Sequence, residues 1–258
     1  MKITLITVAY NSADTLRDTI ESVYKQTHLD IEYIVIDGMS NDNTVGLIKE
    51  YEPKFAGRMR WISEQDHGMY DAMNKGIILA TGDVIGILNS DDFFTSDNVI
   101  EKIVTAFNST GDVDGVYGDI CFVKPECLSK IVRYYSAKWF NPSLFRFGFM
   151  PPHPSFYVRR NCYTDFGLYK TNYKISADYE LLIRYLYVNK LKTHYLNFCV
   201  TTMRTGGDST RNLKSNWILN KEIVRGCREN GIYTNILILV FKYFVKITGI
   251  IFTNRNKL

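Results

Sequence analysis

Residues 31–38 read "IEYIVIDG", and this stretch decides the fold class. The run is apolar almost throughout and then stops at an aspartate and a glycine. A nearly continuous apolar strand is typical of a parallel sheet that is covered on both faces. Strands of the same kind are expected at 3–10, 58–64 and 83–88, and helices between and after them at 12–27, 44–51, 70–80 and 97–107. The alternation predicts a wound, mostly parallel α/β sheet flanked by helices.

The composition limits the classes of protein to which the chain can belong. The chain has 258 residues, 46% of them hydrophobic and 22% charged, which fits one large globular domain with or without a helical tail. A net charge of +4 is too small to indicate a nucleic-acid partner. The cysteine count is odd and no C-x-x-C occurs, so neither a disulfide framework nor a zinc site is expected.

The second half of the chain changes character. Its expected elements are strands at 114–123, 129–136 and 194–203, and helices at 177–188 and 213–230. We therefore divide the chain into a domain at 1–212, with halves 1–110 and 111–212, and a C-terminal helical extension at 213–258. The apolar run 236–252 carries Lys242 and Lys246 and is shorter than the roughly 20 residues of a spanning helix. It suits an amphipathic helix lying on a membrane surface, or a helix docked on the domain.

Polar residues follow each of the first four strands. The strand ends read "AYN" (9–11), "DGMSNDNT" (37–44), "EQDHG" (64–68) and "NSDD" (89–92). Ligands of an open parallel sheet bind at the carboxyl ends of its strands, so these segments predict a cleft. The first strand is not followed by a glycine-rich dinucleotide motif, and there is no P-loop.

A nucleotide diphosphate in this cleft would need another counter-charge. Mg²⁺ or Mn²⁺ held by Asp91, with help from Asp92, would supply it. The competing reading is that the two aspartates cap the following helix. A second loop, "TGGDST" (205–210), contains Gly206, Gly207 and Ser209 and is followed by Arg211. It is either a plain surface turn or a loop that folds over a diphosphate.

Five fragments in order carry a resemblance: "TVAYN", "IDGMSNDNT", "EQDHGMYDAMNKGI", "GILNSDD" and "ISADYEL". Together they resemble the family 2 inverting glycosyltransferases of the GT-A fold, and the bacterial subgroup that builds O-antigen, capsule and colanic acid. The likeness extends over about residues 1–210. It implies a GT-A fold with a C-terminal helical extension, a UDP-sugar donor, and Mn²⁺ or Mg²⁺ as cofactor.

The resemblance also implies roles for individual residues. Asp37 would accept the imide N–H of uracil, unless it only forms an Asx-turn. Asp91 would bind the metal, although Asn89 stands where the strict D-x-D motif has its first aspartate. The implied nucleotide-binding set is Ala9, Tyr10, Asn11, Asp37, Asp42, Asp66, Asn74, Asn89 and Ser90.

The remaining implied roles concern the acceptor. Asp178 matches the catalytic base, with Glu180 as the fallback and a helix-terminal charge as the alternative reading. His153 would face the acceptor or be structural, and Asp92 would support the site or the ribose. Gly206, Gly207, Ser209 and Arg211 would meet the acceptor or the diphosphate.

The function implied is transfer of a sugar from a UDP-sugar to a lipid-diphosphate-linked saccharide. Its expected place is the cytoplasm, peripheral on the cytoplasmic face of the inner membrane. A nucleotidylyltransferase is an alternative, although it would want a Gly-rich, Arg-bearing loop where this chain has "NSADT". A non-catalytic module that binds a sugar nucleotide or a membrane is another, and it would not require Asp178.

Overall fold

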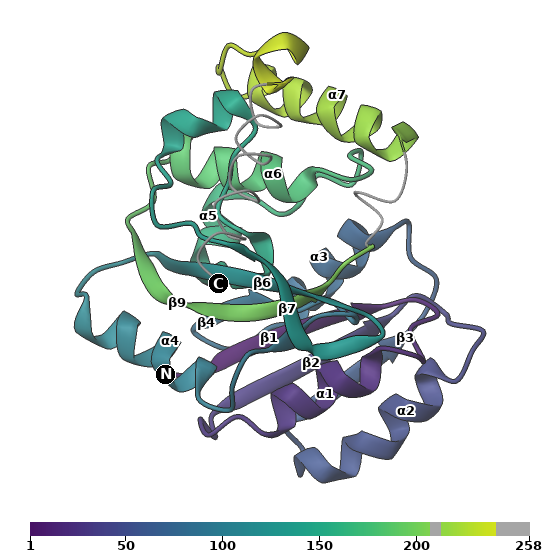
Figure 1. The fold of residues 1–258 in the computed structure, drawn as a ribbon. Helices are drawn as coiled ribbons and strands as arrows, with labels where there is room; N and C mark the ends of the chain where they lie inside the picture. Colours follow the sequence, from purple (N-terminus) through teal and green to yellow (C-terminus); the bar gives the residue numbers. More distant parts are fainter. Residues whose placement is uncertain (207–212, 241–258) are drawn as a thin grey trace.

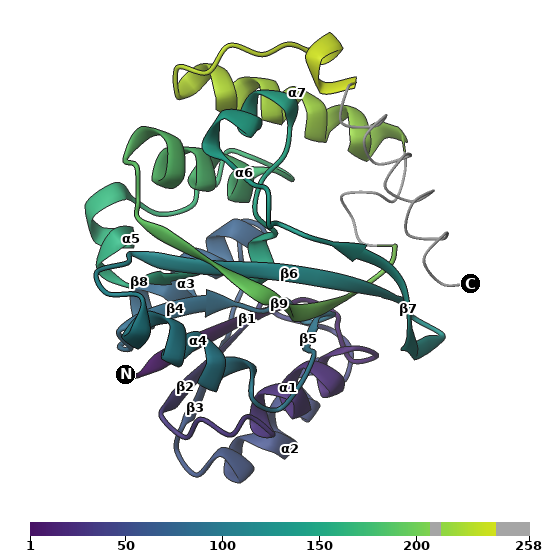
Figure 2. The same cartoon turned by 60° about the vertical axis from the view of Figure 1, so that its left-hand side comes forward.

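A single nine-stranded sheet runs through the computed structural model, which describes residues 1–206 and 213–240. The strand order is β3-β2-β1-β4-β8-β6-β9-β5, and β7 pairs with β6 off this path. The strands are β1 (Ile3–Ala9), β2 (Ile31–Asp37), β3 (Met59–Ser63), β4 (Val84–Ile87), β5 (Phe93–Phe94), β6 (Gly115–Lys124), β7 (Cys127–Tyr135), β8 (Tyr157–Arg159) and β9 (Thr193–Arg204). Figure 1 shows the sheet as one twisted layer between helices, and Figure 2 shows the long strands β6 and β9 of that layer side by side.

The first four strands are parallel, as the sequence predicts. β1 pairs with β2 from Ile3↔Ile31 to Ala9↔Asp37, and β2 pairs with β3 up to Asp37↔Ser63. Every residue of β1 and β2 is buried, which is why their sequences are nearly continuous apolar runs. The register places Ala9, Asp37 and Ser63 side by side at one edge of the sheet.

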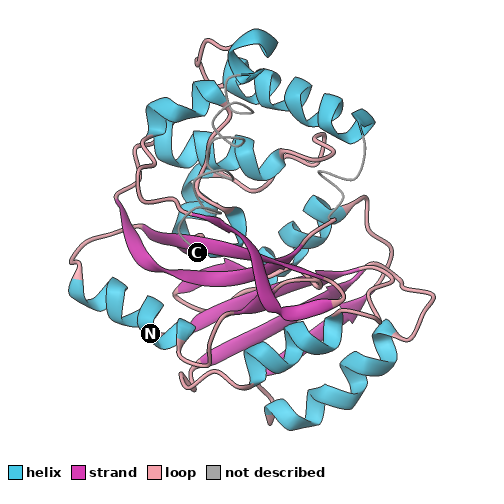
Figure 3. Ribbon diagram, in the orientation of Figure 1, coloured by secondary structure: helices cyan, strands magenta, loops and turns pink. Residues whose placement is uncertain are grey.

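Helices cover both faces of the sheet (Figure 3). They are α1 (Leu16–Tyr24), α2 (Thr44–Tyr51), α3 (Met69–Leu79), α4 (Val99–Ser109), α5 (Asn161–Phe166), α6 (Ala177–Leu182) and α7 (Leu213–Glu229). Short 3₁₀ turns lie at Glu52–Phe55, Pro142–Phe147 and His153–Ser155, and a π-helical stretch, Ile183–Val188, continues α6.

Alternate residues of β1 and β2 enter two separate cores. Leu5 and Val35 pack with α1, α2 and α4, whereas Ile6 and Ile36 pack with α3, α6 and α7. α3 lies very close to β1, since a Cβ on Gly76 would come within 2.5 Å of Ile6. This close approach explains the glycine in "MNKGI" and fixes the start of α3 near the strand ends.

The sequence-based boundaries differ from the structure at several points. The helix expected at 12–27 begins only at Leu16, because residues 13–15 form a turn. The two-residue β5 and the short β8 and α5 were not expected. The expected wound α/β sheet flanked by helices is confirmed by the observed topology.

α7 packs on the preceding domain. Its Ile223 and Cys227 are buried in the same core as Tyr179 of α6, and Leu239 also belongs to that core. The division at residue 212 stays a prediction, but the described part of the extension shares the domain's core. In the described ranges, 1–206 and 213–240, no helix has the length and apolarity needed to cross a bilayer. Most of the run 236–252 lies outside the described residues.

Candidate functional site

Three strand ends meet at the edge of the sheet. Gly38 N–H donates to the carbonyl of Ala9 (2.8 Å), and a Cβ on Gly38 would lie 3.1 Å from Asp66 Oδ2 and 3.4 Å from the Tyr10 ring. Ala9 is buried, whereas the Tyr10 side chain is 62% exposed. Tyr10 therefore presents an open aromatic surface beside Asp66, and Gly38 has to remain small.

Asp37 has no exposed surface. Its carboxylate accepts hydrogen bonds from Ser63 Oγ (2.6 Å), from Ser40 N–H (3.1 Å) and from the Ser40 hydroxyl. In this conformation Asp37 therefore organises the loop. Its predicted contact with a base stays a prediction, and it requires the Ser40 hydroxyl to turn away.

Asn11 and Asp42 brace the same loops. Asn11 Oδ1 accepts from Asn41 N–H (2.8 Å), and its own N–H donates to Ser40 Oγ (2.8 Å). Asp42 accepts from the backbone N–H groups of Ala13 and Thr44, both at 3.0 Å. Asn11 has φ 49°, a left-handed conformation that asparagine tolerates better than most residues. These contacts hold the loops after β1 and β2 together.

The turn after β4 holds the predicted metal ligand. Ser90 Oγ lies 2.9 Å from Ser12 Oγ, and Asn89 Nδ2 donates to Asp92 Oδ2 (3.2 Å). Asp92 is buried, and burial together with the neighbouring charge of Asp91 holds its pKa well above the usual range. The predicted contact of Asp92 with an acceptor, diphosphate or ribose stays a prediction, and it would require this buried side chain to turn outward.

Two oxygen atoms in this turn have no hydrogen-bond donor among the described residues. They are Asn89 Oδ1 and Asp92 Oδ1, and both are buried. Together with the partly exposed Asp91 they form a set of hard oxygen ligands, which is the kind that Mg²⁺ and Mn²⁺ prefer. No cluster of three or more His, Cys, Asp or Glu side chains suited to a metal exists in the described ranges. A cation bound at this turn would therefore need further ligands from outside the described residues.

Arg204, which directly precedes the loop at 205–210, is a further functional candidate. Its guanidinium donates to the backbone carbonyl of Asp91 and to the carboxylate of Asp18, and it lies 5.3 Å from the Phe93 ring. β9 brings it there by pairing with β5 at Phe93↔Thr202. Arg204 therefore links the end of β9 to the Asp91 turn and to α1.

Asp178 lies at the start of α6, beside the first turn of α3. Its Oδ1 accepts from Tyr179 N–H (2.9 Å) and lies 3.4 Å from the hydroxyl of Tyr70. Burial raises the pKa of Asp178 to about 6. At neutral pH the carboxylate is mostly ionised but binds a proton readily, which is what a general base requires.

Three other predicted residues have structural partners. His153 is buried, its Nε2 lies 3.0 Å from the Tyr169 hydroxyl, and burial lowers its pKa to about 4. These contacts favour the structural alternative for His153, and its contact with the acceptor stays a prediction. The amide of Asn74 exchanges two 2.9 Å hydrogen bonds with the backbone of Tyr169, so both its groups are used by the scaffold. Glu180 is fully buried between Lys170 (2.8 Å) and Arg184 (3.1 Å), which rules it out as a fallback base.

Two further predictions concern Asp66, which is described, and the glycine loop, which is only partly covered by the described residues. The carboxylate of Asp66 is paired with Lys75 at 2.6 Å, so the charge of Asp66 is already compensated. Gly206 is described and has φ +100°, a conformation that favours glycine. Gly207, Ser209 and Arg211 lie outside the described residues.

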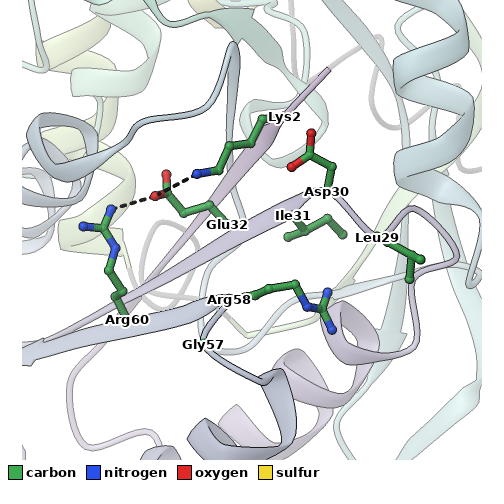
Figure 4. Close-up of a pocket in the computed structure, with 8 residues that line it drawn as sticks. All are labelled: Lys2, Leu29, Asp30, Ile31, Glu32, Gly57, Arg58 and Arg60. Carbon is green, nitrogen blue, oxygen red and sulfur yellow. Dashed lines mark hydrogen bonds and ion pairs between the residues drawn. The ribbon is translucent and has the colours of Figure 1, made fainter.

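Two hollows border different edges of the sheet. One, of about 320 Å³, lies between His67–Tyr70 and Thr171–Lys174, so Tyr70 belongs to its wall and also approaches Asp178. The other, of about 230 Å³, lies at the amino ends of the strands, where Glu32 pairs with Lys2 and Arg60 (Figure 4). The first is therefore the one that adjoins the candidate base.

The fold has counterparts among solved structures. It is similar to TarS 1–349 of S. aureus in complex with UDP-GlcNAc, with a TM-score of 0.66 and 16% identity over 88% of this chain and 66% of that one. It is also similar to the mannosyltransferase PcManGT of Pyrobaculum calidifontis in complex with GDP-Man and Mn²⁺, with a TM-score of 0.62 and 16% identity over 88% and 63%. The chain spans only 39% of the longer TarS chain. These likenesses define the fold as that of the GT-A glycosyltransferases.

The sequence comparisons then give the family. Residues 4–204 match Glycosyl transferase family 2, and the chain belongs to this family. It is 34% identical to an uncharacterized glycosyltransferase of Mycobacterium tuberculosis over 70% of this chain and 68% of the relative. It is 27% identical to a PGL/p-HBAD biosynthesis glycosyltransferase of Mycobacterium bovis over 86% and 82%. The predicted family is confirmed, and the O-antigen and capsule subgroup stays a prediction.

Proposed function

We propose that the protein is a metal-dependent inverting glycosyltransferase that uses a UDP-sugar and a lipid-diphosphate-linked saccharide acceptor. In this proposal it serves bacterial surface polysaccharide synthesis. The observation that carries the proposal is Asp178 at the start of α6, because burial raises its pKa to about 6 and its Oδ1 lies 3.4 Å from the Tyr70 hydroxyl, which suits a proton acceptor.

The reaction requires only one proton acceptor from the protein. Asp178 takes the proton of an acceptor hydroxyl while that oxygen bonds to the anomeric carbon from the face opposite the nucleotide. The bond from the anomeric carbon to the diphosphate oxygen breaks, and its electron pair leaves with UDP. An α-linked donor therefore gives a β-linked product.

The donor is assigned to the loops after β1, β2 and β4. The exposed Tyr10 ring would stack on the base, and Asp37 would select uracil once Ser40 turns away. The TarS complex contains UDP-GlcNAc and the PcManGT complex contains GDP-Man, which supports a nucleoside diphosphate sugar for this chain too. Asp91 and Asn89 Oδ1 would hold a divalent cation, which supplies positive charge to the leaving diphosphate.

The acceptor is assigned to the hollow between His67–Tyr70 and Thr171–Lys174. Tyr70 lines this hollow and approaches Asp178, so a saccharide bound there would have a hydroxyl near the base. His67 and Lys174 line the same hollow and would meet the negative charge of an acceptor diphosphate.

Attachment to a membrane surface is also part of the proposal. Tyr233 is 73% exposed and Leu237 is 83% exposed, and they lead into the apolar, lysine-bearing run that ends at 252. Exposed aromatic and aliphatic side chains followed by lysines suit an anionic bilayer surface. Full-length protein should sediment with anionic vesicles more than with neutral ones, and Leu237→Glu should reduce this. Leu29→Glu, at a 76% exposed site beside the amino end of β2, should not.

A donor panel tests the central proposal. Purified protein is titrated with UDP-, GDP- and dTDP-sugars in the presence of Mn²⁺ or EDTA, and nucleotide release is followed. We expect binding confined to UDP-sugars and weakened about 100-fold by EDTA or by Asp91→Asn, since a metal contributes several kcal/mol at a diphosphate. Equal binding of all three nucleotides with EDTA present would overturn both the base and the metal assignments.

A further inference from the structure

Glu222 of α7 binds the backbone immediately ahead of Asp178. Its Oε1 accepts from Lys174 N–H (2.6 Å), and its Oε2 accepts from Ile175 N–H and Ser176 N–H, both at 2.9 Å. Three successive backbone donors thus converge on one carboxylate. Ser176 is the residue before α6, so this contact fixes the point at which the helix bearing Asp178 begins.

The same backbone strip also holds Tyr70. The Tyr70 hydroxyl donates to the carbonyl of Ile175 and lies 3.4 Å from Asp178 Oδ1. Glu222 therefore accepts the N–H of Ile175, and Tyr70 donates to its C=O, so that both backbone polar groups of this residue are held. A shift of this residue would move both Asp178 and the tyrosine beside it.

α7, which carries Glu222, packs closely against α6 and the core. Ile223 and Cys227 are buried, and a Cβ on Gly226 would lie 3.6 Å from Glu180 Cβ, which shows how closely α7 approaches α6. The residues that match the family end at 204, so the carboxylate comes from a helix beyond the matched part of the chain.

We propose that Glu222 is a positioning residue for the transfer reaction, which fixes the 174–176 backbone and through it the orientation of Asp178. The inference rests on the proposed function, because it takes Asp178 as the base. It assigns part of the catalytic geometry to the C-terminal helix.

The negative charge of Glu222 also changes the pKa of Asp178, and the direction of this change can be measured. The titratable groups that act on Asp178 are Tyr70 of α3, Tyr169 and Glu222 of α7. Burial raises the pKa of Asp178 first, and the negative charge of Glu222 raises it further. Removing that charge should move the acidic limb of the rate profile to lower pH.

The test compares Glu222→Gln with Glu229→Gln in the full chain. Glu229 lies on the same helix and pairs with Lys170 (2.9 Å) and Arg225 (2.6 Å), but it does not bind the 174–176 backbone. For Glu222→Gln we expect kcat to fall about tenfold or more, since small misplacements of a catalytic group have large effects. The donor KM should stay unchanged, and the acidic limb should move down in pH. Glu229→Gln should keep the wild-type profile.

The outcomes separate this inference from the proposed function. Active wild-type enzyme combined with a Glu222→Gln variant that matches Glu229→Gln in kcat and pH profile would overturn the positioning role alone. Wild-type protein that transfers no sugar from any donor would instead contradict the proposed function. If Glu222→Gln does not fold, Glu222→Asp decides: a several-fold lower kcat with the wild-type acidic limb supports the role, and a wild-type kcat overturns it.

Discussion

The two halves of the sheet differ in how far apart in the sequence their contacting elements lie. In residues 1–110, β1, β2 and β3 pair in sequence order, β4 returns to pair with β1, and each polar loop follows its own strand. In residues 111–240, β6 pairs with β7, β8 and β9, and the end of β9 returns to the turn that holds Asp91. The loops after β1 and β2 are therefore held by partners within the first half, whereas the turn at Asp91 and the start of α6 at Asp178 also depend on partners distant in the sequence.

The largest expected effect concerns the base of the second half. Asp178→Asn should lower kcat about 10³-fold, because a positioned general base contributes about 10²–10⁴-fold. Donor binding, which belongs to the first half, should be unchanged by calorimetry. In the wild type the rate should fall as the pH drops below about 6, the pKa to which burial raises Asp178.

Asp165→Asn serves as the control for Asp178→Asn. It makes the same change of side chain at an exposed aspartate of α5, to which no role in the reaction is assigned. Asp178→Asn should not lower the stability at pH 8. Folding raises the pKa of Asp178, so the wild type loses stability as the pH rises from the ordinary value of 3.8 towards about 6. Asparagine does not titrate, so the Asp178→Asn variant does not lose stability in this way. A variant that kept more than a tenth of the wild-type kcat would contradict the base assignment.

The next effect tests the junction between the halves, where β4 pairs with β8. A Cβ on Gly86 would lie 2.1 Å from the ring of Tyr157, which is fully buried. Gly86→Ala should therefore lower the free energy of unfolding by about 1–3 kcal/mol, as overpacking of a core does. Urea unfolding measures this.

Gly46→Ala is the matched control for that substitution. Its Cβ would meet only the end of the Asn43 side chain, which is exposed and can move away. The control should be neutral or slightly stabilising, since Gly46 is helical. Equal destabilisation by both substitutions would mean that close packing of Gly86 against Tyr157 does not cause the loss of stability.

The sequence predicts the first half better than the second for a physical reason. The burial of β2 and the turns after Asp37 and Asn89 follow from local periodicity and local polarity. The contact of Arg204 with Asp18 joins residues 186 positions apart, and no local pattern indicates it. The burial of His153 likewise depends on Tyr169 and on the core around it.

A smaller effect concerns the donor side itself. Tyr10→Ala should weaken donor binding about tenfold, since stacking of a base on an aromatic side chain contributes about 1–3 kcal/mol. Tyr10→Phe should bind as well as the wild type, because the ring is 62% exposed and its π-face is kept. Calorimetric titration with the UDP-sugar separates the two. An alanine variant that binds within twofold of the wild type would show that the base lies elsewhere.

The smallest effect tests how α7 belongs to the second half. Gly226 lies inside α7, and an added Cβ would meet Glu180 and the Tyr173 hydroxyl at 3.6 Å, which is ordinary van der Waals contact. Gly226→Ala should therefore raise the free energy of unfolding by about 0.5–1 kcal/mol, the usual gain for replacing glycine in a helix. Thermal unfolding of the full chain measures it. A loss of stability would mean that α7 approaches α6 more closely than the structure shows, and the position of Glu222 over residues 174–176 would need the same revision.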